Sequence, residues 1–286
     1  MMPAPSSPSP WDLIAIGLLI ASGSLYAAGR HRLGRHAGHT RGRETAAFWS
    51  GWTAMLIAVV PPIDGLATVL FSAHMFQHEL LMLIGAPLIV AGRPLSTCLW
   101  GLPPAARRGA GELLQSGAIG GAWRALTAPA IAWLLHGVVL WVWHAPVLYE
   151  WAVQNEAVHA MQHAMFVGTS VLFWWGLIYG RYGRAGYGAS VFYVFTTVVH
   201  TGLLGAAFAL SSSPIYAVYA ARSADPVGDQ QLAGLVMWVP AGIVLTLTGI
   251  GLFAAWLGES ERRDHAASAN SPASVAYSGQ RRTRSS

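Results

Sequence analysis

The chain has 286 residues, of which 54% are hydrophobic and only 10% charged, whereas about 25% of an ordinary soluble domain is charged. This composition excludes a soluble globule, a disordered chain and a coiled coil, and it indicates a polytopic membrane protein. All 17 basic residues are arginine, against 12 carboxylates. Because no soluble domain remains to carry a nucleic-acid groove, arginines that flank membrane spans are the better interpretation.

Seven apolar stretches follow one another along the chain, each close to the roughly 20 residues that a helix needs to cross a bilayer. Their ranges are 12–28, 46–63, 67–91, 128–144, 156–179, 188–210 and 231–257. Residues 1–258 are therefore predicted to form one all-α, seven-span membrane helix bundle. Residues 259–286, which are rich in Ser, Ala and Arg, are predicted to form a disordered cytoplasmic tail.

The arginines lie on alternate connections. Sixteen of the 17 follow the first, third, fifth or seventh stretch, and only Arg222 falls on the other side. The positive-inside rule then puts the N-terminus outside and the C-terminus in the cytoplasm. The first stretch has no positive residue before it, so an uncleaved anchor is favoured over a signal peptide.

Two pairs of histidines have helical spacing within these stretches. His74 and His78 in the third stretch, and His159 and His163 in the fifth, are each spaced i, i+4. On a helix this spacing puts both imidazoles on one face, about 6 Å apart, where they can share a metal ion. Methionines accompany both pairs, and thioether and imidazole together suit copper, especially Cu(I).

The predicted topology orders the membrane histidines by depth. His144 ends the fourth stretch at the outer face, His136 and His200 lie near the middle of their stretches, and the two pairs lie in the outer half. A single histidine in a membrane helix is often a packing residue. The pairs and their common depth favour a functional interpretation, because ionisable groups inside a bilayer are costly.

Two acidic residues leave alternatives open. Glu79, the only carboxylate deep within a stretch, could neutralise a cation, orient a ligand imidazole or pair with a polar neighbour. Asp229, at the start of the seventh stretch, is suited equally to helix capping and to metal contact. The aromatic residues expected in an interfacial belt are Trp141, Trp143, Tyr149, Trp151 and Trp238.

Motifs of known enzyme classes are missing from the sequence. It contains no Gly-x-Ser-x-Gly, no P-loop and no His-Glu-x-x-His, so hydrolytic and nucleotide-driven chemistry lack support. Cys98 is the single cysteine, which excludes an internal disulfide and a Cys-x-x-Cys metal site. We therefore expect a protein that is not an enzyme.

Several segments together resemble the CtaG-like (caa3-type) family of cytochrome c oxidase assembly factors. They begin at His74-Met75-Phe76-Gln77-His78-Glu79, Trp143-His144-Ala145-Pro146, His159-Ala160-Met161-Gln162-His163 and Asp229-Gln230-Gln231, in the family's order. The resemblance covers about residues 45–257. It implies a multi-pass protein of the bacterial plasma (inner) membrane that helps copper to reach the oxidase. Implied partners are cytochrome c oxidase subunits, membrane lipid and a periplasmic copper chaperone, with no nucleic acid.

The leading hypothesis is an assembly factor that binds Cu(I) on the outer side, with Met75 and Met161 as assisting groups. The core ligands would be His74, His78, His159 and His163, and the entry or accessory groups would be His144 and His200. One alternative is a membrane haem protein, although paired histidines on one face suit opposed axial ligands poorly. Another is a metal or proton transporter, which would need more polar residues in the inner half of the spans.

Overall fold

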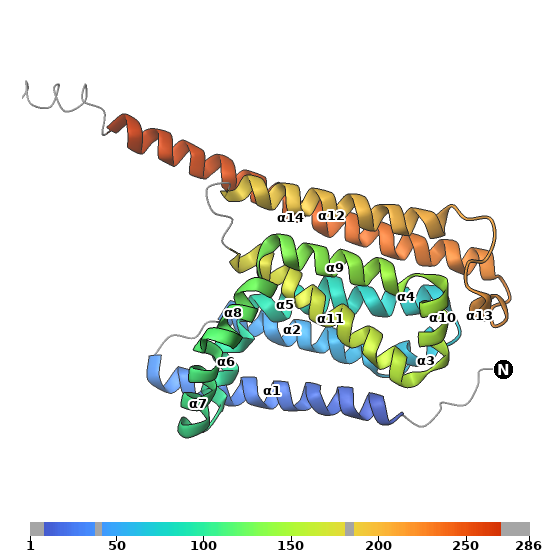
Figure 1. The fold of residues 1–286 in the computed structure, drawn as a ribbon, viewed down its shortest axis with the longest axis horizontal. Coiled ribbons are helices and arrows are strands. Elements are labelled where there is room, and N and C mark those ends of the chain that lie inside the picture. The colour runs from blue at the N-terminus through green and yellow to red at the C-terminus, as the bar shows by residue number, and fades with distance from the viewer. Residues whose placement is uncertain (1–8, 38–41, 181–185, 270–286) are drawn as a thin grey trace, which may run out of the picture.

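A computed structural model describes residues 9–37, 42–180 and 186–269 of the chain. Within these residues the protein is all-helical and contains no strand, which confirms the all-α prediction. The longer helices run roughly along one direction, with α12 and α14 side by side (Figure 1).

Each of the seven apolar stretches coincides with a helix or a run of helices. These are α1 (Pro10–Ala37), α2 (Gly42–Val59), the run α4–η1–α5 (Phe71–Glu79, Leu80–Gly85, Ala86–Ala91), α9 (Pro129–Trp143), α11 (Glu156–Tyr179), α12 (Gly186–Ala209) and α14 (Pro226–Ala269). The agreement is close because proline and glycine flank most of the stretches and end the apolar pattern.

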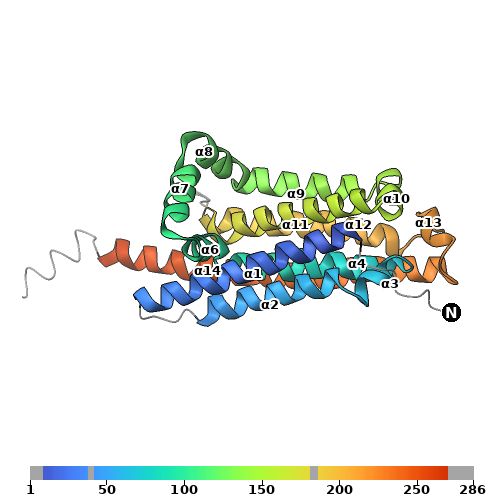
Figure 2. The ribbon, with the colours of Figure 1, turned by 90° about the horizontal axis from the view of Figure 1, so that it is seen from below.

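Shorter helices occupy both ends of the bundle. One end carries α3 (Ile63–Ala67), α10 (Pro146–Gln154) and α13 (Ala217–Ala220), and the other carries α6 (Pro94–Gly101), α7 (Pro104–Gln115) and α8 (Gly117–Leu126) (Figure 2). Three of them begin with proline, which is favoured at the first position of a helix because its missing N–H needs no partner there. The connections expected in the cytoplasm thus lie at the end opposite those expected outside.

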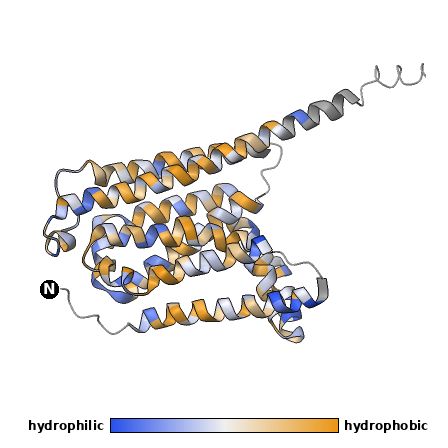
Figure 3. Cartoon of the chain, turned by 180° about the vertical axis from the view of Figure 1, so that it is seen from behind, coloured by the Kyte–Doolittle hydropathy of each residue, from blue (hydrophilic) through white to orange (hydrophobic). Residues whose placement is uncertain are grey.

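Four helical segments in the described residues are long and apolar enough to cross a membrane. They are Pro10–Arg35, Phe71–Ala91, Gly188–Ala209 and Pro226–Gly258, and α8 with α9 would make a fifth if this pair, bent by 67°, is one broken span. The stretches at 46–63 and 156–179 form helices α2 and α11 but are not among these candidates. Figure 3 shows hydrophobic residues along the long helices and the most hydrophilic segments near the ends of the bundle.

The last helix extends beyond the expected end of the membrane domain. α14 remains helical to Ala269, whereas the tail was expected to begin at residue 259. Residues 270–286 lie outside the described residues. The division into a membrane domain and a separate tail stays a prediction.

A π-helical turn interrupts the third apolar stretch directly after the His74–Glu79 segment. Turn η1 joins α4 to α5, and it packs closely against α2 through two glycines. A Cβ atom on Gly51 would lie 2.8 Å from the carbonyl oxygen of Gly85, and one on Gly85 would lie 2.7 Å from Cγ of Met55. Short π-helical turns inside α-helices are frequent at functional sites.

Candidate metal site

The two histidine pairs meet between α4 and α11. The ring centroids of His74 and His78 are 4.5 Å apart, and those of His159 and His163 are 4.1 Å apart. Across the two helices, the His74 and His159 centroids are separated by 5.0 Å and the His78 and His163 centroids by 5.2 Å. The fold therefore brings the four predicted core ligands, residues 85 positions apart in the chain, into one four-histidine cluster.

Three of these imidazoles have geometry close to that of a metal site. One ring nitrogen from each of His74, His78 and His163 lies within 4.8 Å of the other two, and the Nε2 atoms of His74 and His78 are 3.1 Å apart. Metal–nitrogen bonds of about 2.0 Å put the ligand nitrogens about 3.5 Å from one another. Small side-chain movements would therefore be enough to close the three nitrogens around one ion.

Tyr219, on α13, determines which nitrogen of His74 is free. Burial raises the pKa of the Tyr219 hydroxyl above its usual value, so the group keeps its proton and donates it to the carbonyl oxygen of Ala67 at 2.8 Å. The Tyr219 hydroxyl oxygen also lies 2.8 Å from Nδ1 of His74. Because the hydroxyl proton is given to Ala67, this oxygen must accept from Nδ1. His74 is thus protonated on Nδ1, and its Nε2 lone pair faces His78.

His144 lies next to the cluster at the end of α9. Its ring centroid is 6.3 Å from that of His78, and its Nδ1 donates to the carbonyl oxygen of Leu140 at 2.7 Å. Nε2 of His144 is buried and has no hydrogen-bond partner among the described residues. The Tyr216 hydroxyl donates to the backbone carbonyl of His144 at 2.8 Å and so links the segment before α13 to the end of α9.

Asp229 caps the helix that carries the first pair. Leu70, the N-cap residue of α4, has a side chain that cannot cap the helix. The Asp229 carboxylate takes this role and accepts from the backbone N–H groups of Phe71 at 2.7 Å and Ser72 at 3.2 Å. It also accepts from the Ser72 hydroxyl. Capping was one of the two expected roles, but the capped helix is α4 and not Asp229's own α14.

His200 does not join the cluster. Its ring lies beside Trp133, with centroids 5.9 Å apart, and both of its nitrogens are without a hydrogen-bond partner among the described residues. His136 also projects from α9, and its ring lies 5.0 Å from that of Phe173. Of the six predicted ligands, the structure gathers five and leaves His200 apart.

The burial of some methionines and aromatic residues differs from what the sequence led us to expect. Met75 is fully buried, whereas Met161 is 47% exposed. Trp143 and Tyr149 are buried inside the bundle instead of lying in a belt, and Tyr149 stacks on Tyr216 with centroids 4.1 Å apart. No spacing in the sequence links Tyr216 or Tyr219 to the histidines, because tertiary packing alone brings α13 to them.

The helices and the buried cluster define an all-helical protein of membrane type with a histidine site near one end. The family model described as cytochrome c oxidase caa3 assembly factor matches residues 24–259, a range that includes all six predicted ligands. The chain belongs to this family. No curated protein and no solved structure matches it.

Proposed function

We propose that this protein binds Cu(I) at the four-histidine cluster and assists its delivery to cytochrome c oxidase. The observation that carries the proposal is the meeting of the two i, i+4 pairs, which surrounds one small space with imidazole nitrogens. Neutral imidazoles suit Cu(I) and leave one positive charge on the occupied site. Copper is here the cargo, and no catalytic step is assigned to the protein.

The position of the cluster supports loading from the outer side of a bacterial plasma membrane. His74 lies one turn into α4, at the end of the bundle that α3, α10 and α13 cover (Figure 2). The arginine distribution assigns that end to the outside and the α6–α8 end to the cytoplasm. In this arrangement the chain crosses the membrane seven times, with α2 and α11 among the spans.

The proposed partners follow from that location. Copper would reach the cluster from a periplasmic copper chaperone and pass to an oxidase subunit. Lipid surrounds the exposed apolar side chains of the long helices. A surface lined by α10 and α13 is the shortest route from the cluster to such partners, since Tyr149 and Tyr219 of these helices lie beside His74.

A transporter is the second candidate, and a specific cavity favours it. Next to the cluster lies a mainly apolar space of about 60 Å³, and His78, Glu79 and His136 bring ionisable groups to its lining further along the bundle.

Elemental analysis and an optical spectrum of the purified full chain test the proposal. We expect bound copper and no Soret band in protein prepared from copper-supplied cells. A Soret band would identify the protein as a haem protein, and zinc in place of copper would overturn the assignment of the metal.

A further inference from the structure

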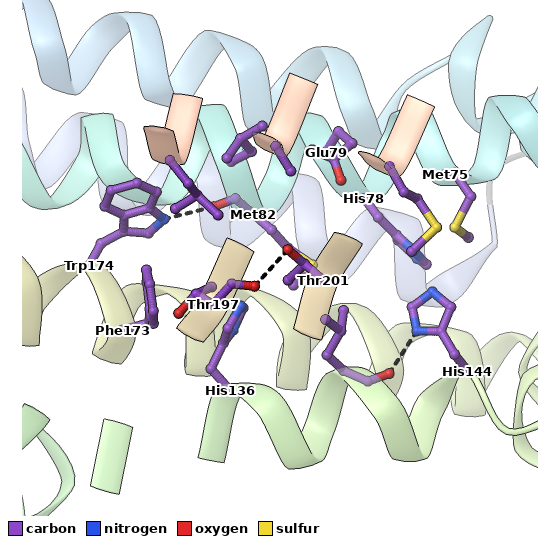
Figure 4. A pocket seen from close by; sticks show the side chains of 15 residues that line it. Met75, His78, Glu79, Met82, His136, His144, Phe173, Trp174, Thr197 and Thr201 are labelled. Atoms are coloured by element: carbon purple, nitrogen blue, oxygen red, sulfur yellow. Dashed lines mark hydrogen bonds between the residues drawn. The ribbon is translucent and has the colours of Figure 1, made fainter. Parts of the chain in front are cut away.

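A cavity of about 60 Å³ lies inside the bundle, next to the four-histidine cluster, with which it shares His78 (Figure 4). Residues of α4, η1, α9, α11, α12 and α14 surround it. His136 and His144 project into it from α9, and His78 and Glu79 approach it from the facing helix. The volume exceeds that of a single water, so the cavity has room for an ion and its ligand atoms.

Buried polar atoms without partners surround this cavity. Nδ1 of His78, Oε2 of Glu79, Nδ1 of His136 and Nε2 of His144 are buried and lack a hydrogen-bond partner among the described residues. His78, His136 and His144 are 4%, 7% and 5% exposed. Nearly all buried polar groups in proteins are paired, and leaving one unpaired costs about 1–3 kcal/mol. Four around one space therefore indicate an occupant that supplies their missing partner.

The donor atoms at the cavity indicate the kind of occupant. Met75, Met82 and Met237 line the same space as the imidazoles, and a set of thioether and imidazole donors suits Cu(I) and not a hard cation such as Ca²⁺. Glu79 supplies one carboxylate, which together with a monovalent cation makes a neutral pair. A neutral pair is the arrangement that a low-dielectric interior tolerates best.

His78 connects the cavity to the cluster. Its Nε2 lies 3.1 Å from Nε2 of His74 in the cluster, while its unpartnered Nδ1 belongs to the ring that lines the cavity. An ion could thus pass from one side of a single imidazole to the other. In the described residues, the group of three His, Cys, Asp or Glu ligand atoms close enough to share an ion lies in the outer cluster. A site at the cavity therefore needs methionine sulfurs as well, and the unbranched methionine side chain can adapt to a bound ion.

We propose that this cavity is a second, inner Cu(I) site, formed by Met82, Met237, His136 and Glu79 and loaded from the outer cluster through His78. The proposal rests on the proposed function, since the outer cluster supplies the ion. The protein then holds two copper ions in sequence along the bundle. The inner ion is coordinated in part by sulfur, and the outer ion by nitrogen.

The test is a Cu(I) titration of the full chain in detergent against a chelator of known affinity. The inner-site variant is Met82→Leu with Met237→Leu, because leucine replaces methionine with little change of volume. The matched control is Met55→Leu, a buried methionine that does not line the cavity. We expect two Cu(I) ions per chain in the wild type and in the control, and one in the inner-site variant.

A second variant separates this proposal from the proposed function. His159→Ala with His163→Ala removes ligands of the outer cluster and leaves the cavity lining intact. We expect it to retain one Cu(I), with sulfur neighbours in its X-ray absorption spectrum. If the wild type binds one ion and this variant none, the outer cluster stands and the inner site is wrong. If the wild type binds no copper, both proposals fail. Two ions in the methionine variant would also overturn the inner site.

Discussion

The hydrogen bonds of the histidines decide which nitrogen atoms are available to a ligand. Nδ1 of His74 and Nδ1 of His144 both donate, to the Tyr219 hydroxyl and to the Leu140 carbonyl. Their Nε2 atoms are consequently unprotonated in the neutral rings. In metalloproteins such a bond to the remote nitrogen fixes the ring and raises its basicity as a ligand.

Replacing Tyr219 by phenylalanine should weaken copper binding. The change removes the acceptor that keeps the proton of His74 on Nδ1, so the ring loses both its orientation and its fixed tautomer. Loss of such a partner typically costs 10–100-fold in metal affinity, and we expect a decrease of about that size in a Cu(I) competition titration.

Tyr216→Phe is the matched control for Tyr219. Both hydroxyls are buried and donate to a backbone carbonyl, so each variant should lose about 1 kcal/mol of stability or more. The Tyr219 variant should lose the larger amount, because its hydroxyl also accepts from His74. Only the Tyr219 variant should lose copper affinity. Equal affinities in the two variants would mean that Tyr219 has a purely structural role.

Helix α4 depends on a distant segment for its N-terminus. Asp229→Ala should remove the cap from Phe71 and Ser72 and loosen the turn that leads to His74, at a cost of about 1 kcal/mol. We expect faster hydrogen exchange at the amides of residues 71–74 and a lower melting temperature by a few degrees, together with weaker copper binding.

Asp225 offers a comparison for this cap. Its carboxylate accepts from the backbone N–H of Gly228 at 2.9 Å in the first turn of α14. Asp225→Ala should cost a similar amount of stability and leave copper binding unchanged. Faster exchange at residues 71–74 in the Asp225 variant, or none in the Asp229 variant, would contradict the assignment.

The sequence predicted the long elements well and the short ones poorly. Apolar runs of membrane length are a strong local signal, and all seven coincide with helices. The i, i+4 spacing likewise predicted that His74 and His78 share a face. In contrast, α10 and α13 are short and stabilised by their packing, and the capping of α4 by Asp229 joins residues 157 or more positions apart. Contacts of that kind leave no trace in local spacing.

The predicted direction of the bundle in the membrane rests on the arginine distribution. Reporter fusions in the α6–α8 segment, residues 94–126, should report a cytoplasmic location, and fusions in α10 or near residue 213 an outside location. The reason is that 16 of the 17 arginines lie on one side of the predicted topology. An outside signal from the α6–α8 segment would reverse the topology and place the histidine cluster at the cytoplasmic face.

The most direct test replaces one histidine from each pair in the full protein. His78→Ala with His163→Ala removes two ligands from different helices, and His31→Ala, in the arginine-rich segment after the first apolar stretch, serves as the control. We predict that the double variant inserts and accumulates but loses most of its copper and its support of oxidase activity, which added copper restores in part. Normal copper content and normal oxidase activity in the double variant would contradict a copper site at the cluster.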